Sequence, residues 1–304
     1  MFEYAPAPES RALITFQSSY GHFIGGKFTK PSNTYQTISP STEEVLAEIS
    51  TAGTKEVDLA VKAARHAYEK VWSKLSGAER GKYLYRIARI IQERARELAI
   101  AETLNNGKPI KETRDADIPL VSAWFFYYAG WADKLDYAGF GQNPKAHGVA
   151  AQVIPWNFPL MMLAWKIAPA LAAGNTVVLK PAETTPLTAL MFAEICQQAG
   201  LPDGVVNIIT GFGATGADLI AHKDVNKVAF TGSTVVGRKI AKQVAGTNKK
   251  VTLELGGKAA NIVFDDAPLD QAVEGIINGI FFNQGHVCCA GSRLLVQESI
   301  QDEL

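Results

Sequence analysis

The sequence contains few cysteines and no excess of charge of either sign. Its 304 residues include three cysteines, two of them adjacent, and the 30 Lys and Arg residues balance the 30 Asp and Glu residues. So few cysteines cannot form a disulfide framework, and they suit a reducing compartment in which a free thiol is available for chemistry. Because no basic block is present, we expect neither nucleic acid nor a membrane surface as a partner.

Long apolar runs and targeting signals are also missing. The longest apolar stretch, 160–179, is interrupted by Lys166, Pro169 and Gly174, whereas a membrane span needs about 20 consecutive apolar residues. The opening Met-Phe-Glu-Tyr-Ala-Pro lacks the basic and apolar regions of a signal peptide. No His/Cys set has the spacing of zinc ligands, so we expect no metal site. These absences favour a globular cytoplasmic protein.

From residue 149 onward, strand patterns alternate with helical patterns. The predicted strands are 149–154, 176–180, 205–209, 228–230 and 251–255, and the predicted helices are 160–173, 214–222, 233–244 and one that Thr185 caps with Pro186 at its first position. This alternation predicts an α/β fold with a parallel sheet and right-handed crossovers. Ligands of such sheets bind beyond the carboxyl ends of the strands.

The segment before residue 149 is less regular. Short β-like runs occur at 22–28 and 45–49, and the apolar spacing over 57–72 predicts a helix. Ser76 and Glu79 have the spacing of a capping box and open the next helix. The apolar face of that helix consists of Leu84, Ile87, Ile91 and Leu98.

Residues suited to ligand binding lie at, or just beyond, the ends of four predicted strands. They are Asn157, the pair Lys180 and Glu183, the pair Gly232 and Ser233, and Glu254. An ammonium and a carboxylate can bind ribose hydroxyls, and the N–H groups of a helix that opens at Ser233 can bind a pyrophosphate. Each feature alone is compatible with a surface ion pair, a turn, a helix cap or a solvated carboxylate. Their presence at successive strand ends favours a ligand site.

Gly211, Gly213 and Gly216 have the spacing G-x-G-x-x-G after a predicted strand. The dinucleotide fingerprint also requires an acidic residue about 20 positions further on. The next strand instead ends in Phe-Thr-Gly-Ser at 230–233. A phosphate-binding turn and a plain turn therefore both remain open.

Two of the three cysteines lie in a polar, glycine-containing segment. Cys288 and Cys289 occur within 281–293, and although a buried structural cysteine is the usual alternative, such a turn is not a core. An exposed thiol beside helix N–H groups would have a lowered pKa and act as a nucleophile. Cys196, in an apolar helical pattern, is expected to be inert.

These motifs occur in the order typical of the aldehyde dehydrogenase superfamily, which the chain resembles from about residue 55 onward. They are Ile-Pro-Trp-Asn-Phe-Pro at 154–159, Lys-Pro-Ala-Glu at 180–183, Phe-Thr-Gly-Ser-Thr at 230–234, Leu-Glu-Leu-Gly-Gly-Lys at 253–258 and Gly-His-Val-Cys at 285–288. The segments 111–119 and 288–298 look most like the long members called family sixteen.

The resemblance implies an NAD-dependent oxidation of an aldehyde to a carboxylic acid. Cys288 would attack the aldehyde as a thiolate. The Asn157 amide and the Cys288 backbone N–H would hold the oxyanion, each contributing on the order of 3 kcal/mol. Hydride transfer to NAD would leave a thioester, and Glu254 would activate the water that hydrolyses it.

The resemblance also implies the binding residues. Lys180 and Glu183 would bind the adenosine ribose, and the carboxylate favours NAD over NADP because it repels a 2′-phosphate. The further cofactor-binding residues would be Gly232, Ser233, Trp156, Gly213 and Leu255. A tunnel for a hydrophobic aldehyde would be lined by Phe158, Met162, Trp165 and Phe282, for which plain core packing is the alternative.

The resemblance divides the chain into domains and marks three departures from the family. Residues 1–134 and 151–256 would form a Rossmann-like NAD-binding domain, and 257–304 would begin a second α/β catalytic domain. The segment 135–150 is shorter than the usual oligomerisation arm, so a homodimer is expected in place of the tetramer. His286 stands where the family has Gln. The chain stops at Leu304, before the downstream Glu that binds the nicotinamide ribose.

Two alternatives remain open. A truncated, non-catalytic NAD-binding or interaction protein of the same fold would also have these strand-end residues. A CoA-acylating relative is disfavoured by Glu254, because water activation competes with transfer to a thiol.

Overall fold

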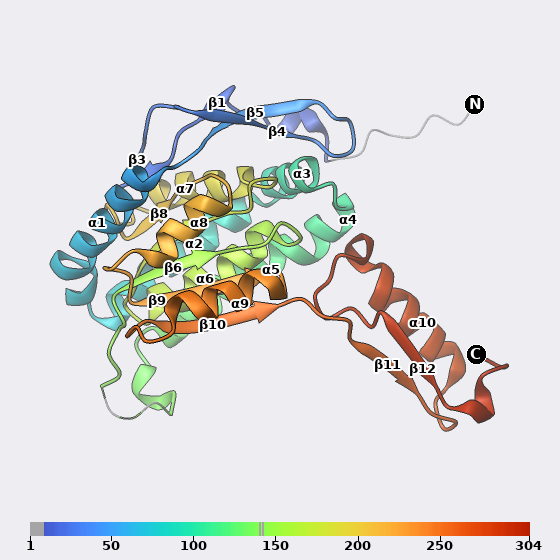
Figure 1. Cartoon of the computed structure of the whole chain (residues 1–304). Helices are drawn as coiled ribbons and strands as arrows, with labels where there is room; N and C mark the ends of the chain where they lie inside the picture. Colours follow the sequence, from blue (N-terminus) through green and yellow to red (C-terminus); the bar gives the residue numbers. More distant parts are fainter. Residues whose placement is uncertain (1–8, 140, 142) are drawn as a thin grey trace.

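A seven-stranded sheet runs through the part of the chain that the computed structural model describes, residues 9–139, 141 and 143–304 (Figure 1). Its strand order is β10-β9-β6-β7-β8-β2-β3, in which the first five strands are parallel and β2–β3 is an antiparallel hairpin at the β8 edge. The strands are β2 (Phe23–Ile24), β3 (Lys27–Phe28), β6 (Val149–Val153), β7 (Thr176–Lys180), β8 (Val206–Ile208), β9 (Lys227–Gly232) and β10 (Lys250–Leu255). The predicted α/β fold is confirmed.

Helices cover both faces of the sheet because its central strands are apolar on both sides. In β7, Val177 and Leu179 belong to one buried cluster and Val178 belongs to the other, as expected for a strand whose successive side chains point to opposite faces. The first cluster includes α2 (Gly77–Glu93), α3 (Ala95–Asn106), α5 (Ile118–Trp131), α6 (Pro159–Ala172) and α7 (Leu187–Gln198), and the second includes α1 (Thr54–Lys70), α8 (Gly213–Ala221) and α9 (Thr234–Val244).

The strands and helices expected after residue 149 are present, and except for α7 their bounds differ from the expected ones by no more than two residues. Of the earlier elements, the run 22–28 is the β2–β3 hairpin, and 45–49 is β5 (Val45–Ser50). This strand lies in a separate sheet of order β1-β5-β4, with β1 (Ser19–Tyr20) and β4 (Thr34–Ile38). The helix predicted at 57–72 begins three residues earlier, at Thr54.

The prediction of one continuous helix from Ser76 through Leu98 is wrong. Ser76 caps α2 through the expected capping box, and the four predicted core residues are buried. However, α2 ends before Arg94, and Leu98 lies in α3. Arg94 has φ −95° and ψ 13°, and its guanidinium donates to Glu194 on α7 at 2.9 Å. A contact distant in the sequence therefore stabilises the break.

The start of α7 also differs from the prediction. Pro186 occupies the cap position and not the first helical position, and Thr185 makes no capping bond. The Leu187 N–H donates instead to the Asn105 side-chain oxygen at 3.1 Å. An amide from α3 thus caps α7 in place of the local hydroxyl.

After β10 the chain leaves the sheet and forms a separate region, which we call the outlying unit (residues 257–304) to distinguish it from the body (the described residues before 257). Figure 1 shows it at the lower right, projecting from the body. It contains β11 (Ala260–Val263) and β12 (Arg293–Val296) as a parallel pair, α10 (Leu269–Phe281) and the 3-10 turn η5 (Phe282–Gly285). No residue of α10 is buried.

Some expectations concern residues that the structure does not describe. Residues 1–8, on which the expected absence of a signal peptide rests, and 140 and 142 of the segment 135–150 lie outside the described residues. The described beginning of that segment is a 3-10 turn, Leu135–Tyr137. No helix in the described ranges combines the length and apolar character needed to cross a bilayer.

Candidate active site

The strand ends singled out in the sequence lie at one edge of the sheet. Val153, at the end of β6, is opposite Lys180 on β7 and Phe230 on β9. Glu254 on β10 is opposite Thr231 on β9. Because these strands are parallel and in register, the residues that follow them meet at the same edge, where α/β sheets bind ligands.

The Lys180–Glu183 pair combines a buried cation with a partly exposed carboxylate. The Lys180 Nζ lies 3.6 Å from the Glu183 carboxylate, and the two side chains are 4% and 45% exposed. Burial lowers the pKa of Lys180, and Glu183 opposes that shift. A Cβ on Gly216 would lie 3.4 Å from the lysine stem, so this glycine lets α8 pack against it, whereas Gly213 opens α8 with free space around it.

The start of α9 is held close to β9 and β10 by glycines. A Cβ on Gly232 would lie 2.5 Å from the Phe230 ring, and one on Gly237 would lie 2.4 Å from Leu255. Ser233 caps the helix with its side chain. The remaining N–H groups of the first turn are therefore available at the sheet edge for an anion.

Asn157 connects the β6 end to the loop that carries the cysteines. Its side-chain Nδ2 donates to the backbone carbonyl of His286 at 2.7 Å, two residues before Cys288. A primary amide has two N–H donors, so this bond leaves one for a substrate oxygen. The structure thus brings two of the predicted catalytic segments together, although they are far apart in the sequence.

The expected environment of Cys288 is only partly correct. Cys288 and Cys289 are exposed, as predicted, and Cys196 is buried. The prediction of a lowered thiol pKa is wrong, because partial burial and the neighbouring Cys289 raise the pKa of Cys288. No helix begins beside this thiol in the described residues. Instead α10 and η5 end before it, and a helix C-terminus disfavours an anion.

Glu254 has a cationic neighbour that the sequence reasoning missed. Burial lowers the pKa of Lys166, on α6, to about 8, with Lys227 adding to the shift and the Glu254 carboxylate opposing it. Glu254 itself is exposed on the edge strand β10. The available signal was a single Lys in the otherwise apolar run of α6.

Three of the four predicted substrate-pocket residues share one side of α6. Phe158, Met162 and Trp165 are spaced i, i+4 and i+7, which places them on the same face. Phe282 comes from the outlying unit and stacks on Phe158, with ring centroids 6.5 Å apart. Trp165 stacks on Trp124 of α5 at 5.3 Å, a partner that the sequence did not single out. Burial of Phe158 also fits the core-packing alternative.

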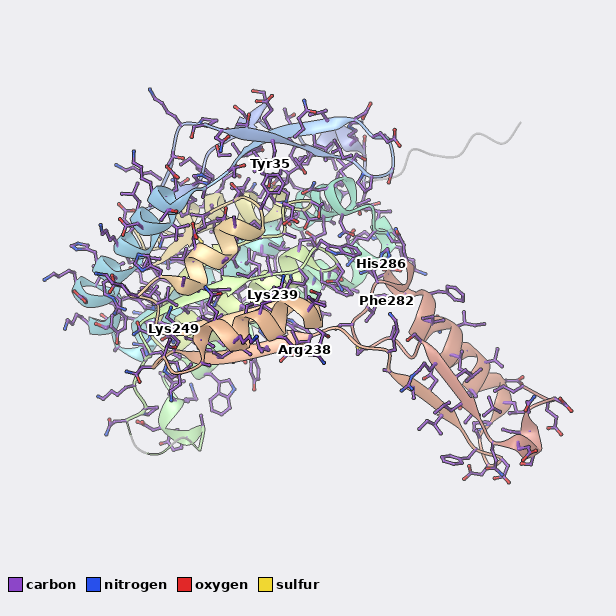
Figure 2. The ribbon with its side chains drawn as sticks, in the orientation of Figure 1. Tyr35, Arg238, Lys239, Lys249, Phe282 and His286 are labelled. Atoms are coloured by element: carbon purple, nitrogen blue, oxygen red, sulfur yellow. The ribbon has the colours of Figure 1, made fainter. Side chains whose placement is uncertain are left out.

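A groove of about 770 Å³ extends between the predicted cofactor residues and the cysteine loop. Its lining includes Trp156, Glu183, Gln284 and His286, and the Trp156 and His286 rings meet edge to face at 4.8 Å. Figure 2 shows His286 and Phe282 where the outlying unit meets the body. Among the residues that the structure describes, no group of three or more His, Cys, Asp or Glu could hold a metal ion.

The sequence is similar to those of known proteins. A profile described as the aldehyde dehydrogenase family matches residues 28–304. An aldehyde dehydrogenase of Alternaria alternata is 48% identical over 300 residues, which are 95% of this chain and 60% of that protein. An Arabidopsis thaliana protein named aldehyde dehydrogenase family 2 member B4, mitochondrial, is 49% identical over 293 residues, or 92% and 54%.

Solved structures give the same result. The NAD+ complex of an aldehyde dehydrogenase from Bacillus cereus superposes with a TM-score of 0.89 at 44% identity, covering 94% of this chain and 60% of that one. The chain therefore spans about three fifths of the length of the relatives that it matches. The expected likeness to family sixteen stays a prediction.

Proposed function

The chain belongs to the aldehyde dehydrogenase family, and from that premise we propose that the whole protein oxidises a hydrophobic aldehyde to a carboxylic acid with NAD. The observation that carries the proposal is the 2.7 Å bond from the Asn157 amide to the His286 carbonyl. It holds an oxyanion donor beside the loop of an exposed cysteine, which is the pairing that acyl chemistry on a thiol requires.

The residues at the sheet edge fit NAD chemically. The Lys180 ammonium and the Glu183 carboxylate suit ribose hydroxyls, and the first turn of α9, at Gly232 and Ser233, suits a pyrophosphate. In our proposal Trp156, Gly213 and Leu255 complete this surface. An aldehyde dehydrogenase of Bacillus cereus with a similar structure has been solved as an NAD+ complex. NAD bound there would supply the hydride acceptor.

The first step is nucleophilic addition. The Cys288 thiolate would form a bond to the aldehyde carbon as the carbonyl π electrons move to oxygen. The free N–H of Asn157 and the Cys288 backbone N–H would stabilise that oxyanion, a contribution of about 3 kcal/mol each. Phe158, Met162, Trp165 and Phe282 would hold the apolar part of the aldehyde and exclude water.

The last step is hydrolysis of the thioester on Cys288. Glu254 would take a proton from water, whose oxygen attacks the acyl carbon, and the C–S bond would break to release the acid and the thiolate. Lys166, whose pKa burial lowers to about 8, would place a positive charge near this carboxylate.

We also propose the division expected from the resemblance: 1–134 and 151–256 as the NAD-binding domain, 257–304 as the beginning of a catalytic domain, and 135–150 as a short arm in a homodimer. The three free cysteines favour a reducing compartment, and we place the protein in the cytoplasm.

NADH formation tests the function directly. The whole protein, incubated with hexanal and NAD, should form NADH. Cys288→Ser should abolish this activity, whereas the matched variant Cys289→Ser should keep it. Undiminished activity of Cys288→Ser would sink the proposal.

A second candidate is a nucleotide-binding protein of the same fold without turnover. The raised pKa of Cys288 favours it, because a protonated thiol is a weak nucleophile at neutral pH. Calorimetry with NAD separates the candidates. Binding without NADH formation favours the second, and failure to bind NAD counts against both.

A further inference from the structure

Two oppositely charged side chains are buried beside the backbone of Asn157 and have no part in the reaction proposed above. Lys108 and Asp117 form an ion pair, and their side chains are 0% and 1% exposed. Burying such a pair is costly unless the charges meet further polar groups. The Lys108 Nζ does so by donating to the backbone carbonyl of Asn157 at 3.3 Å, and it also lies 3.8 Å from the Phe158 ring centroid.

The same carbonyl receives a second donor from the outlying unit. The Asn283 Nδ2 donates to the Asn157 carbonyl at 2.9 Å and also approaches the His286 carbonyl at 3.2 Å. The Asn283 backbone N–H donates to the Glu112 carboxylate at 2.9 Å. Asn283 therefore contacts the body through both its backbone and its side chain.

The backbone of Asn283 is held in an uncommon conformation. Its φ of 48° and ψ of 41° are left-handed, although the side chain is 2% exposed. Asn is among the few non-glycine residues that tolerate this region. Asn33, in the body, is an asparagine with the same φ of 48°, but it is exposed. The two asparagines share a left-handed backbone and differ in their surroundings.

These bonds form a closed set around the predicted oxyanion donor. Asn157 donates its amide to the His286 carbonyl, while Asn283 donates to the carbonyls of both residues. The orientation of the Asn157 amide and the position of the loop that leads to Cys288 are thus fixed by one shared side chain.

We propose that Asn283, with Lys108 as a second donor, is the positioning residue that holds the Asn157 amide in register with the Cys288 loop. The inference rests on the proposed function and deepens it. Loss of Asn283 leaves both carbonyls without that donor, and the amide is no longer aligned with the developing oxyanion. A misplacement of about 1 Å at a reacting centre can cost on the order of a hundredfold.

The test compares Asn283→Gly with Asn33→Gly. Glycine accepts the left-handed backbone at either position, so the two variants make the same substitution and only the first removes the donor to the Asn157 carbonyl. Asn283→Asp keeps the size and the left-handed tolerance without the donor, and it is the second variant if Asn283→Gly does not give the wild-type circular dichroism spectrum.

The readout is alkylation of Cys288 by iodoacetamide in the full chain, measured on the Cys288 peptide by mass spectrometry. The reaction is run with and without hexanal, and NAD is absent throughout. Addition of hexanal to the thiol protects it, and that protection depends on the oxyanion donors. For Asn283→Gly we expect the hexanal concentration for half-protection to rise about 10- to 100-fold, with alkylation in the absence of hexanal changed less than about twofold. Asn33→Gly should match the wild type.

The outcomes are distinguishable. Wild-type protection in Asn283→Gly, or an equal loss in Asn33→Gly, would overturn the positioning role and leave the proposed function standing. Wild-type Cys288 that is alkylated but never protected by hexanal would overturn the proposed function itself, and the inference that rests on it.

Discussion

The body and the outlying unit differ in what stabilises each of them. The body surrounds its sheet with two apolar clusters in which side chains such as Leu160, Val178 and Phe192 are fully buried. In the outlying unit α10 buries no residue, and Phe264 and Phe281 are 60% and 70% exposed. Its described contacts with the body include polar bonds at the predicted active site, made by residues 283–286.

This contrast shows how the candidate site is built. The body supplies Asn157 and Glu254, which lie at strand ends. The close-packed core fixes the positions of those strand ends. The outlying unit supplies Cys288 on an exposed loop, which a few hydrogen bonds orient. The site therefore depends on burial for one half and on polar contacts for the other, and substitutions in the two regions should differ in what they change.

The largest expected effect is on the core of the body. Trp72 is fully buried, and its indole N–H donates to the Leu171 carbonyl at 3.3 Å. Trp72→Ala should lower the free energy of unfolding by about 3–5 kcal/mol, measured by urea denaturation followed by circular dichroism. Phe281→Ala, at a ring of the outlying unit that is 70% exposed, should change it by less than about 0.5 kcal/mol. Equal losses in both variants would remove the distinction between the regions.

The second effect depends on pH. Burial, with Asp117 adding to it, raises the pKa of Glu102 from 4.5 to about 7. The stability that its protonated form contributes is full below about pH 4.5 and is lost as the pH rises through 7. Glu102→Gln lacks this loss. From pH 5 to pH 8.5 the variant should therefore gain stability relative to the wild type, by roughly 3 kcal/mol at most. A difference that does not change with pH would contradict the assignment.

A smaller effect is expected at a helix end on the surface of the body. The Ser76 hydroxyl accepts from the Glu79 N–H, and the Glu79 carboxylate accepts from the Ser76 N–H. Ser76→Ala should cost about 1 kcal/mol in urea denaturation. Ser76→Asp, which can also cap a helix, should recover most of it, and a loss of the same size there would rule out capping as the cause.

The smallest effect on stability is expected on the exposed apolar face of the outlying unit. Phe264→Ser together with Phe281→Ser should change the free energy of unfolding by less than about 0.5 kcal/mol. Because large exposed apolar patches promote association, the double variant should elute from size-exclusion chromatography with less concentration dependence than the wild type. A large loss of stability would show that this face packs in the body's core.

Much of the body was predictable because its signals are local. Alternating strand and helix patterns predicted the parallel sheet in which Lys180 and Glu254 lie, and a capping box marked the start of α2. The break at Arg94 was not predictable from the periodicity, since the Arg94 guanidinium there bonds a carboxylate 100 residues away as well as the local Glu97. The predicted cap of α7 was wrong for the same reason, because the Asn105 side chain caps this helix in place of the Thr185 hydroxyl.

The candidate site was predictable in its strand-end residues and not in its supporting contacts. Asn157 follows β6 and Glu254 lies near the end of β10, so the rule for α/β sheets finds both. Nothing in the periodicity indicates that Lys108 is buried, or that Asn283 reaches across 126 residues to Asn157. The thiol pKa was mispredicted because partial burial and the neighbouring Cys289 raise it, and the turn pattern does not indicate that burial.

In the proposed mechanism, Cys288 of the outlying unit and Glu254 of the body act in the same reaction. The most direct measurement is the mass of the Cys288 peptide after Glu254→Gln protein is incubated with hexanal and NAD. Without its base the variant should accumulate the hexanoyl thioester on Cys288, and the adduct should be absent in Glu254→Gln with Cys288→Ser. An adduct on Cys289 would contradict this mechanism. The absence of any adduct on a variant that still binds NAD would contradict it as well.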